Sequence, residues 1–184
     1  MSVTPIIAAI VHPGKHLPHC PIPALVNRLR KQGWRVRGLI NDTADGPFDC
    51  SALFLRDVHS KARYPISQPR GKQALACGLD AGALMDTASV LHQAHQARPD
   101  LALVNRFGKL EAMGQGFVQE MLDFMVDDIP LLTVVSSDHL DSWRVFTDCL
   151  AQELPPQLDA LLAWAQGLPA AQWHPLGKPL YAST

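Results

Sequence analysis

Three short apolar runs constrain the fold of this chain more than any other feature. They cover residues 5–11 (PIIAAIV), 101–105 (LALVN) and 129–135 (IPLLTVV). A continuous apolar run of this length predicts a strand that is buried on both faces of a parallel sheet. Helical patterns separate the three runs, and strands that alternate with helices predict a three-layer α/β fold with a mainly parallel sheet.

The remaining elements follow from spacing and from turn residues. Apolar residues at helical spacing predict helices over residues 24–32, 81–97, 117–125, 136–151 and 155–167, and alternation predicts a strand over residues 34–40. Asp80 is expected to cap the second helix, and Ser136 to Asp138, with Asp141 three residues on, to begin the fourth as a capping box. Residues 51–58 and 63–67 predict two more strands, in an antiparallel excursion from the main sheet. Residues 1–167 are therefore expected to form one α/β domain, and residues 168–184 an extended tail.

Composition narrows the class of protein. Hydrophobic residues make up 47% of the 184 residues, which predicts a globular domain with a full core. The 16 basic and 17 acidic residues are interspersed, whereas a protein that mainly binds nucleic acid needs a basic excess. No apolar run approaches the roughly 18 residues of a membrane span, and the first residues show no signal-peptide pattern. We therefore expect a cytoplasmic protein with neither nucleic acid nor membrane as a partner, whose cysteines are free thiols.

The stretch 101–116 is the best candidate for a functional site. Its apolar strand turns polar at Asn105 and Arg106, and Gly108, Lys109 and Glu111 follow. In open parallel sheets, ligands bind at the carboxyl ends of the strands, which is where these residues are expected to lie. The sequence Gly114-Gln115-Gly116 then has two interpretations: a helix start that attracts anions, or a turn that needs glycine torsions.

A second candidate follows the first strand, where Gly14 and Lys15 match the end of the phosphate-binding pattern GxxxxGK[ST]. The first glycine of that pattern would fall at Ala9 and its hydroxyl at His16, so two of four signature positions are lost. The pair is either a degenerate phosphate loop or a chance turn before a proline-rich segment. Arg70 and Gly71 form a basic turn that either contacts an anion or is simply solvated.

A cluster of potential metal ligands overlaps the segment around Gly14 and Lys15. It comprises His12, His16, His19 and Cys20, and such side chains bind zinc or copper. Their spacing matches no standard site and prolines fix the backbone between them, so no metal is assigned. The sequence does not identify a cofactor, and it does not indicate the oligomeric state.

The segment NRFGKLEAMGQGF (105–117), with SQPRG (67–71) and CGLD (77–80), resembles a bacterial family catalogued as domain of unknown function 2478. The resemblance extends from the first strand to about Trp164. More distantly, NRFGKLE resembles the DEIGKME-type motif of small nucleoside-triphosphatases first seen in thermophiles, which implies a P-loop fold. Members of the unknown-function family are often associated with molybdate uptake and molybdenum-cofactor metabolism, and the resemblance favours an anion contact at Arg70.

The resemblance to the triphosphatases also shows where this chain departs from them. The motif's paired carboxylates fall at Asn105 and Arg106, an amide and a permanent cation. We therefore expect a binding protein for a nucleotide, a pterin phosphate or an oxyanion. That protein would show no Mg²⁺-dependent hydrolysis of ATP or GTP, since phosphoryl transfer depends on the metal and on an oriented water. Two alternatives are an active triphosphatase that uses Lys15, Lys109 and Glu111 in unusual roles, and an interaction protein with a vestigial pocket.

Overall fold

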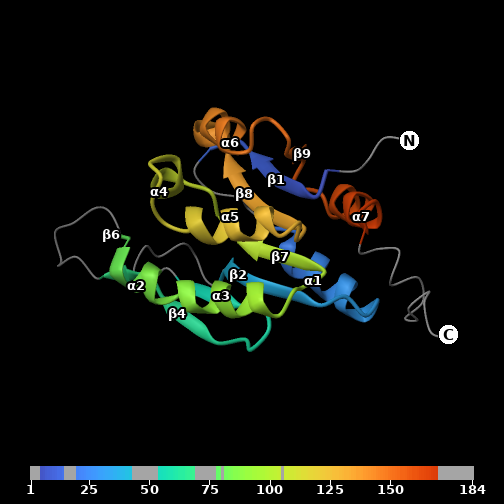
Figure 1. The fold of residues 1–184 in the computed structure, drawn as a ribbon, viewed down its shortest axis with the longest axis horizontal. Helices are drawn as coiled ribbons and strands as arrows, with labels where there is room; N and C mark the ends of the chain where they lie inside the picture. The colour runs from blue at the N-terminus through green and yellow to red at the C-terminus, as the bar shows by residue number, and fades with distance from the viewer. Residues whose placement is uncertain are drawn as a thin grey trace.

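The main sheet is mainly parallel, as predicted. The computed structural model describes residues 5–14, 20–42, 54–68, 78–79, 81–104 and 106–169. Within these residues seven strands form one sheet in the order β4 (Arg63–Pro65), β3 (Phe54–Asp57), β2 (Val36–Asn41), β7 (Leu101–Val104), β8 (Leu131–Ser136), β1 (Ile7–His12) and β9 (Gln152–Leu154) (Figure 1). The five strands from β2 to β9 are parallel, and β3 and β4 continue the sheet in antiparallel pairing. A separate two-stranded ladder joins β5 (Ser67–Gln68) and β6 (Gly78–Leu79).

The three apolar runs are the interior strands β7, β8 and β1, which confirms the prediction made from them. Their side chains alternate between two cores, one on each face of the sheet. Ile10, Leu103 and Val134 belong to one core, whereas Ala9 and Val104 belong to the other. Burial on both faces explains why these runs are apolar at successive positions.

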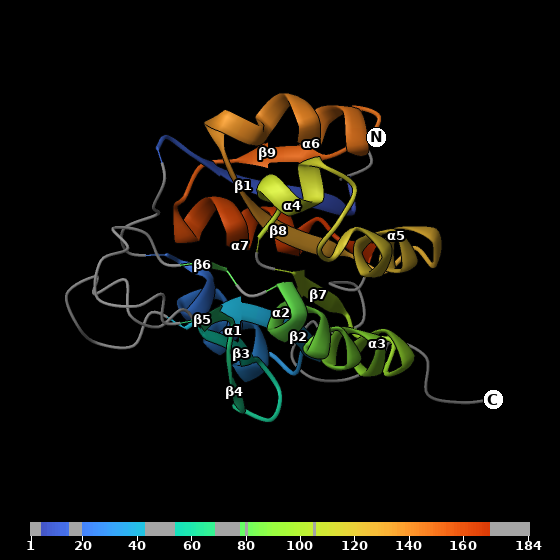
Figure 2. The ribbon, with the colours of Figure 1, turned by 90° about the vertical axis from the view of Figure 1, so that its left-hand side faces the viewer.

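Helices cover both faces of the sheet and complete the three layers (Figure 2). One face carries α1 (Ile22–Lys31) and α7 (Leu158–Gln166), and the other carries α3 (Ala88–Gln96), α5 (Val118–Val126) and α6 (Leu140–Phe146). Two short helices, α2 (Ala81–Asp86) and α4 (Lys109–Ala112), and a 3₁₀ turn (Ser137–His139) complete this part of the chain. In the part that the structure describes, no helix is long and apolar enough to cross a membrane.

The predicted helix over residues 81–97 is interrupted at Thr87. This side chain is buried, and its hydroxyl donates to the Leu84 carbonyl at 2.6 Å. Such a bond competes with the helical backbone pattern, so α2 ends there and α3 begins one residue later. The expected cap Asp80 lies outside the described residues.

The prediction of one helix over residues 136–151 is wrong at both ends. The start of α6 makes no capping hydrogen bond through a side chain, at either Ser136 or His139. The helix ends at Phe146, because Asp148 and Cys149 take left-handed torsions (φ 49° and 56°) that break it. The chain then forms β9, which pairs with β1. A three-residue edge strand has no periodicity of its own, so only its partner reveals it.

Candidate functional site

The carboxyl ends of β1 and β8 lie side by side, with His12 paired to Ser136 in the register. From β1 the chain crosses one face of the sheet through α1, and from β8 it crosses the opposite face through α6. Adjacent strands whose connections diverge in this way define the crevice where ligands bind in open α/β sheets. At this edge Gly14, with φ of 77°, follows β1, and the exposed Ser137 and Asp138 follow β8. Sequence reasoning treated the latter two only as a helix start.

The structure shows where the first position of the phosphate-binding pattern lies. Ala9, where the first signature glycine would fall, lies inside β1 and pairs with Thr133 on one side and Glu153 on the other. The strand continues to His12, whose ring is buried and whose Nδ1 lies 3.2 Å from the Pro13 carbonyl. The position where the pattern has its first glycine therefore lies within the strand itself and not in a loop.

The connection from β7 to α5 (residues 106–117, the β7–α5 connection) is anchored to β8 by a buried hydroxyl. Thr133 Oγ1 donates to the Val104 carbonyl at 2.6 Å and accepts the Phe107 N–H at 3.1 Å. The Phe107 ring packs against Trp143 and Phe146 of α6, with ring centroids 5.2 and 5.4 Å away. These contacts fix the position of the residues on either side of Phe107.

Glu111 holds the middle of the same connection. Its side chain is buried, and Oε2 accepts the Gly108 N–H at 2.9 Å while Oε1 accepts the Phe117 N–H at 3.2 Å. The carboxylate therefore ties the start of α4 to the residue before α5. Among the candidate site residues, Glu111 has a structural role that its place in the motif does not reveal.

Glycine is needed at Gly114 and at Gly116 for different physical reasons. Both have positive φ, 75° and 61°, in a turn that precedes α5, which supports the glycine-turn interpretation. A Cβ at Gly114 would meet nothing within 4 Å, whereas a Cβ at Gly116 would overlap the Glu111 carboxylate. Gly116 is thus required by contact as well as by torsion.

Arg106 and Lys109 are exposed on either side of Gly108. A Cβ at Gly108 would lie 3.5 Å from Arg106 Nε, so the Arg106 side chain passes beside this glycine. Among the described residues, neither cation makes an ion pair. Lys15, Arg70, Gly71 and Asn105 lie outside those residues, so the convergence of cations in one cleft stays a prediction.

A buried ion cluster closes the carboxyl end of β2. The Asp42 side chain, 1% exposed, pairs with Arg56 of β3 and Arg63 of β4, which are 39% and 46% exposed. The Arg63 guanidinium also lies over the Phe54 ring, 4.5 Å from its centroid. The cluster joins the antiparallel strands to the parallel part of the sheet.

The metal interpretation of the His/Cys cluster stays open. The described residues contain no group of three potential metal ligands, but His16 and His19 lie outside them. Burial raises the pKa of the Cys20 thiol, and a backbone hydrogen bond from Ile22 lowers it by less. At neutral pH this residue therefore carries less thiolate than a free cysteine.

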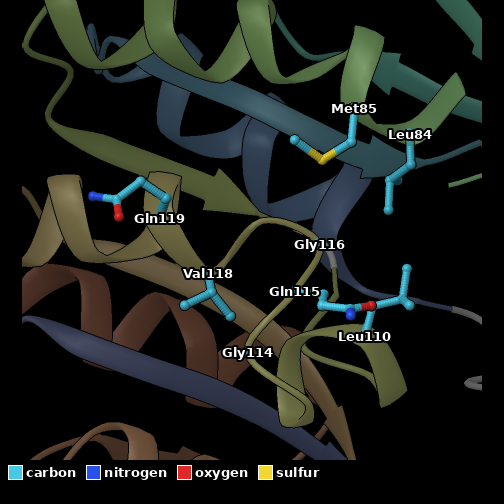
Figure 3. A pocket seen from close by; sticks show the side chains of 8 residues that line it. All are labelled: Leu84, Met85, Leu110, Gly114, Gln115, Gly116, Val118 and Gln119. Carbon is cyan, nitrogen blue, oxygen red and sulfur yellow. The ribbon is translucent and has the colours of Figure 1, made fainter. Parts of the chain in front are cut away.

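A pocket of about 430 Å³ opens between α2 and α4, and we call it the α2–α4 pocket. Leu84 and Met85 reach into it from α2, and Leu110, Gln115 and Val118 line the other side (Figure 3). Gly114 and Gly116 form part of its wall, and Gln119 completes it. Sequence reasoning pointed only to the segment Gly114-Gln115-Gly116 of this pocket, because the two walls come from distant parts of the chain.

These features define a class. The strand order and the helices on both faces are those of a P-loop nucleoside-triphosphatase fold. The solution structure of a human cancer-related nucleoside triphosphatase matches it with a TM-score of 0.57 over 81% of this chain and 88% of that chain, at 15% identity. The chain belongs to the family described as "Protein of unknown function (DUF2478)", whose model matches residues 7–164.

A further relative is the molybdenum import ATP-binding protein ModC 2 of Bradyrhizobium diazoefficiens. It is 29% identical over 137 residues, which are 74% of this chain. The match covers only 15% of that protein, so its named activity does not transfer with the match.

Proposed function

We propose that this protein binds a small anionic ligand, a nucleotide, pterin phosphate or oxyanion, without hydrolysing it. The observation that carries the proposal is the state of Glu111, the carboxylate of the family motif. Both of its oxygens accept backbone N–H groups, while Arg106 and Lys109 beside it are exposed. The β7–α5 connection therefore presents positive charge on a braced backbone, which suits anion binding.

Hydrolysis requires more than this connection offers. A triphosphatase needs side chains that hold Mg²⁺ and a group that orients the attacking water. His16 and Asn105 stand where the family of triphosphatases has a hydroxyl and a carboxylate, and Arg106 replaces the second carboxylate. We expect purified protein to release no phosphate from ATP or GTP above background with Mg²⁺.

The likeness to a molybdenum import protein supports a narrower role. We place the ligand in molybdate or molybdenum-cofactor metabolism, with the protein as an accessory rather than the import ATPase itself. The matched region is a minor part of that relative, consistent with a segment that accompanies an ATPase. Molybdate and pterin phosphates are both anions, so one cationic edge serves either.

A thermal-shift panel of ATP, GTP, molybdate, tungstate and phosphate tests the proposal. A ligand at about 100 times its dissociation constant adds about 2.7 kcal/mol of stability, or a rise in Tm of about 5–10 °C for a chain of this size. The double variant Arg106→Gln/Lys109→Gln should lose the shift. Arg28→Gln/Lys31→Gln, with the same charge change at the exposed end of α1, should keep it. A shift that survives the first variant would refute this site.

The alternative of an active triphosphatase rests on one feature. Asp138 is exposed directly after β8, beside the end of β1, where a carboxylate could serve a metal. Mg²⁺-dependent turnover that disappears in both Lys109→Ala and Asp138→Asn would establish this alternative. The third alternative, an interaction protein with a vestigial pocket, predicts that no compound of the panel shifts Tm.

A further inference from the structure

The α2–α4 pocket has the chemistry of a site for a flat, partly polar ring. Leu84, Leu110 and Val118 supply apolar walls, and Met85, 52% exposed, lies at the opening. Thioether sulfur makes favourable contacts with aromatic rings and adapts to their shape. A volume of about 430 Å³ falls in the range of small-molecule sites.

Polar groups in the pocket can recognise the edge of such a ring. Gln115 is exposed and lines the pocket, so its carboxamide offers both donors and acceptors (Figure 3). Gln119 donates to Asp123 at 2.8 Å, which turns its amide along α5 and leaves its stem in the wall. Gly114 and Gly116 expose peptide backbone, against which a planar group packs closely.

The pocket also adjoins the exposed cations of the β7–α5 connection, Arg106 and Lys109. Lys109 and Leu110 are consecutive residues of α4, so one turn of helix presents a cation and a pocket wall. Glu111 holds α4 and the following turn, residues 114–116, in place. Its carboxylate accepts the N–H of Gly108 before α4 and the N–H of Phe117 after that turn. A ligand with a charged group at Lys109 therefore has an apolar recess beside it.

We infer that the α2–α4 pocket receives the heteroaromatic ring of a phosphate-bearing ligand, the base of a nucleotide or the ring of a pterin phosphate. This inference rests on the function proposed above and deepens it, because a bare oxyanion would leave the pocket empty. The shared chemistry is a planar ring with N–H and carbonyl groups at its edge. The experiment distinguishes the two sources of such a ring, a nucleotide and a pterin phosphate.

The experiment compares GTP, ATP and neopterin triphosphate with inorganic tripolyphosphate, which has the charged chain and no ring, by titration calorimetry. We expect a ring-bearing compound to bind about tenfold tighter than tripolyphosphate. Met85→Gln should weaken that compound about fivefold, as loss of one apolar wall predicts, and leave tripolyphosphate unchanged. Met113→Gln is the matched control, since Met113 is 61% exposed and lies outside the pocket.

A second variant, Gln115→Trp, fills the opening from an exposed loop position and should abolish the advantage of the ring. Equal affinity for tripolyphosphate and all ring compounds, unchanged by Met85→Gln, would overturn the inference and leave anion binding intact. Binding of ring compounds that ignores Arg106→Gln/Lys109→Gln would support the pocket and overturn the anion site. Binding of none of these compounds would overturn the inference, and the molybdate and tungstate arms of the thermal-shift panel would then decide whether anion binding stands.

Discussion

Two buried carboxylates lie near the carboxyl edge of the sheet, and different kinds of groups contact their oxygens. Among the described residues, Glu111 accepts hydrogen bonds from the backbone N–H groups of Gly108 and Phe117. Asp42 pairs with the side chains of Arg56 and Arg63, both partly exposed. A carboxylate bound by backbone determines the path of the chain, whereas one bound by arginines mainly holds neighbouring strands together. The first arrangement therefore shapes the candidate site, and the second holds the framework of the sheet together.

Removal of the Glu111 carboxylate should have the largest effect. Glu111→Ala leaves two buried N–H groups without acceptors, each worth about 1–3 kcal/mol, so we expect a loss of about 3 kcal/mol. Tm should fall by about 6–10 °C, and the ligand-induced shift should disappear because the β7–α5 connection loosens. Differential scanning fluorimetry with and without ligand measures both. An unchanged Tm would show that these bonds do not brace the connection.

Substitutions at the two glycines test the same contacts of Glu111 while Glu111 itself is kept. Gly116→Ala strains the left-handed torsion and overlaps the Glu111 side chain, whereas Gly114→Ala has the strain alone. The strain costs about 1–2 kcal/mol, and we expect Gly116→Ala to cost about 2 kcal/mol more. Chemical denaturation gives both values. In a Glu111→Ala background the difference should shrink to the smaller cost of the 3.2 Å contact with Leu110 Cβ, and an unchanged difference would contradict the proposed overlap with Glu111.

Replacement of Asp42 should have a smaller effect. In Asp42→Asn the two arginines lose their anion but reach water, so we expect a loss of about 1–2 kcal/mol. The loss should shrink in about 1 M salt, where screening acts over about 3 Å. Ligand shifts should be retained, in contrast to Glu111→Ala. If they are lost as well, the two carboxylates do not divide their roles as described.

Glu120 offers a third case, a carboxylate with one buried oxygen that has no partner among the described residues. Burial raises the pKa of Glu120, as does Asp123, while a backbone hydrogen bond and His92 lower it by less. Since the folded state holds this proton more tightly, stability is lost as pH rises through the raised pKa. Glu120→Gln should raise Tm by about 1–2 °C near pH 7 and not at about pH 4. The same gain at both values would exclude this titration.

The sequence predicted the elements whose signal is local. The interior strands were visible because both of their faces are buried, and α7 was visible from its apolar period between Pro155-Pro156 and Gly167. The break at Thr87 and the strand β9 were not predicted. A side-chain bond to a carbonyl and a pairing with β1 depend on what lies nearby in space.

The candidate site was predictable only in part, for the same reason. The rule that ligands bind after parallel strands pointed to Arg106, Gly108 and Lys109, and these lie at the carboxyl edge. It also pointed to Glu111 as a ligand contact, whereas the structure shows its oxygens bound to backbone. Residue type reveals a charge but not its partner.

The sequence by itself determined the class of fold and the residue types that stand at the positions of the triphosphatase motif. Apolar runs determine which strands are buried, and the residues at positions 16, 105 and 106 determine which groups are available for chemistry. Only the tertiary structure decided that Glu111 braces the site, that Gly116 makes room for it, and that α2 and α4 enclose a pocket. These properties depend on distances between residues far apart in the chain, which folding sets and no local pattern encodes.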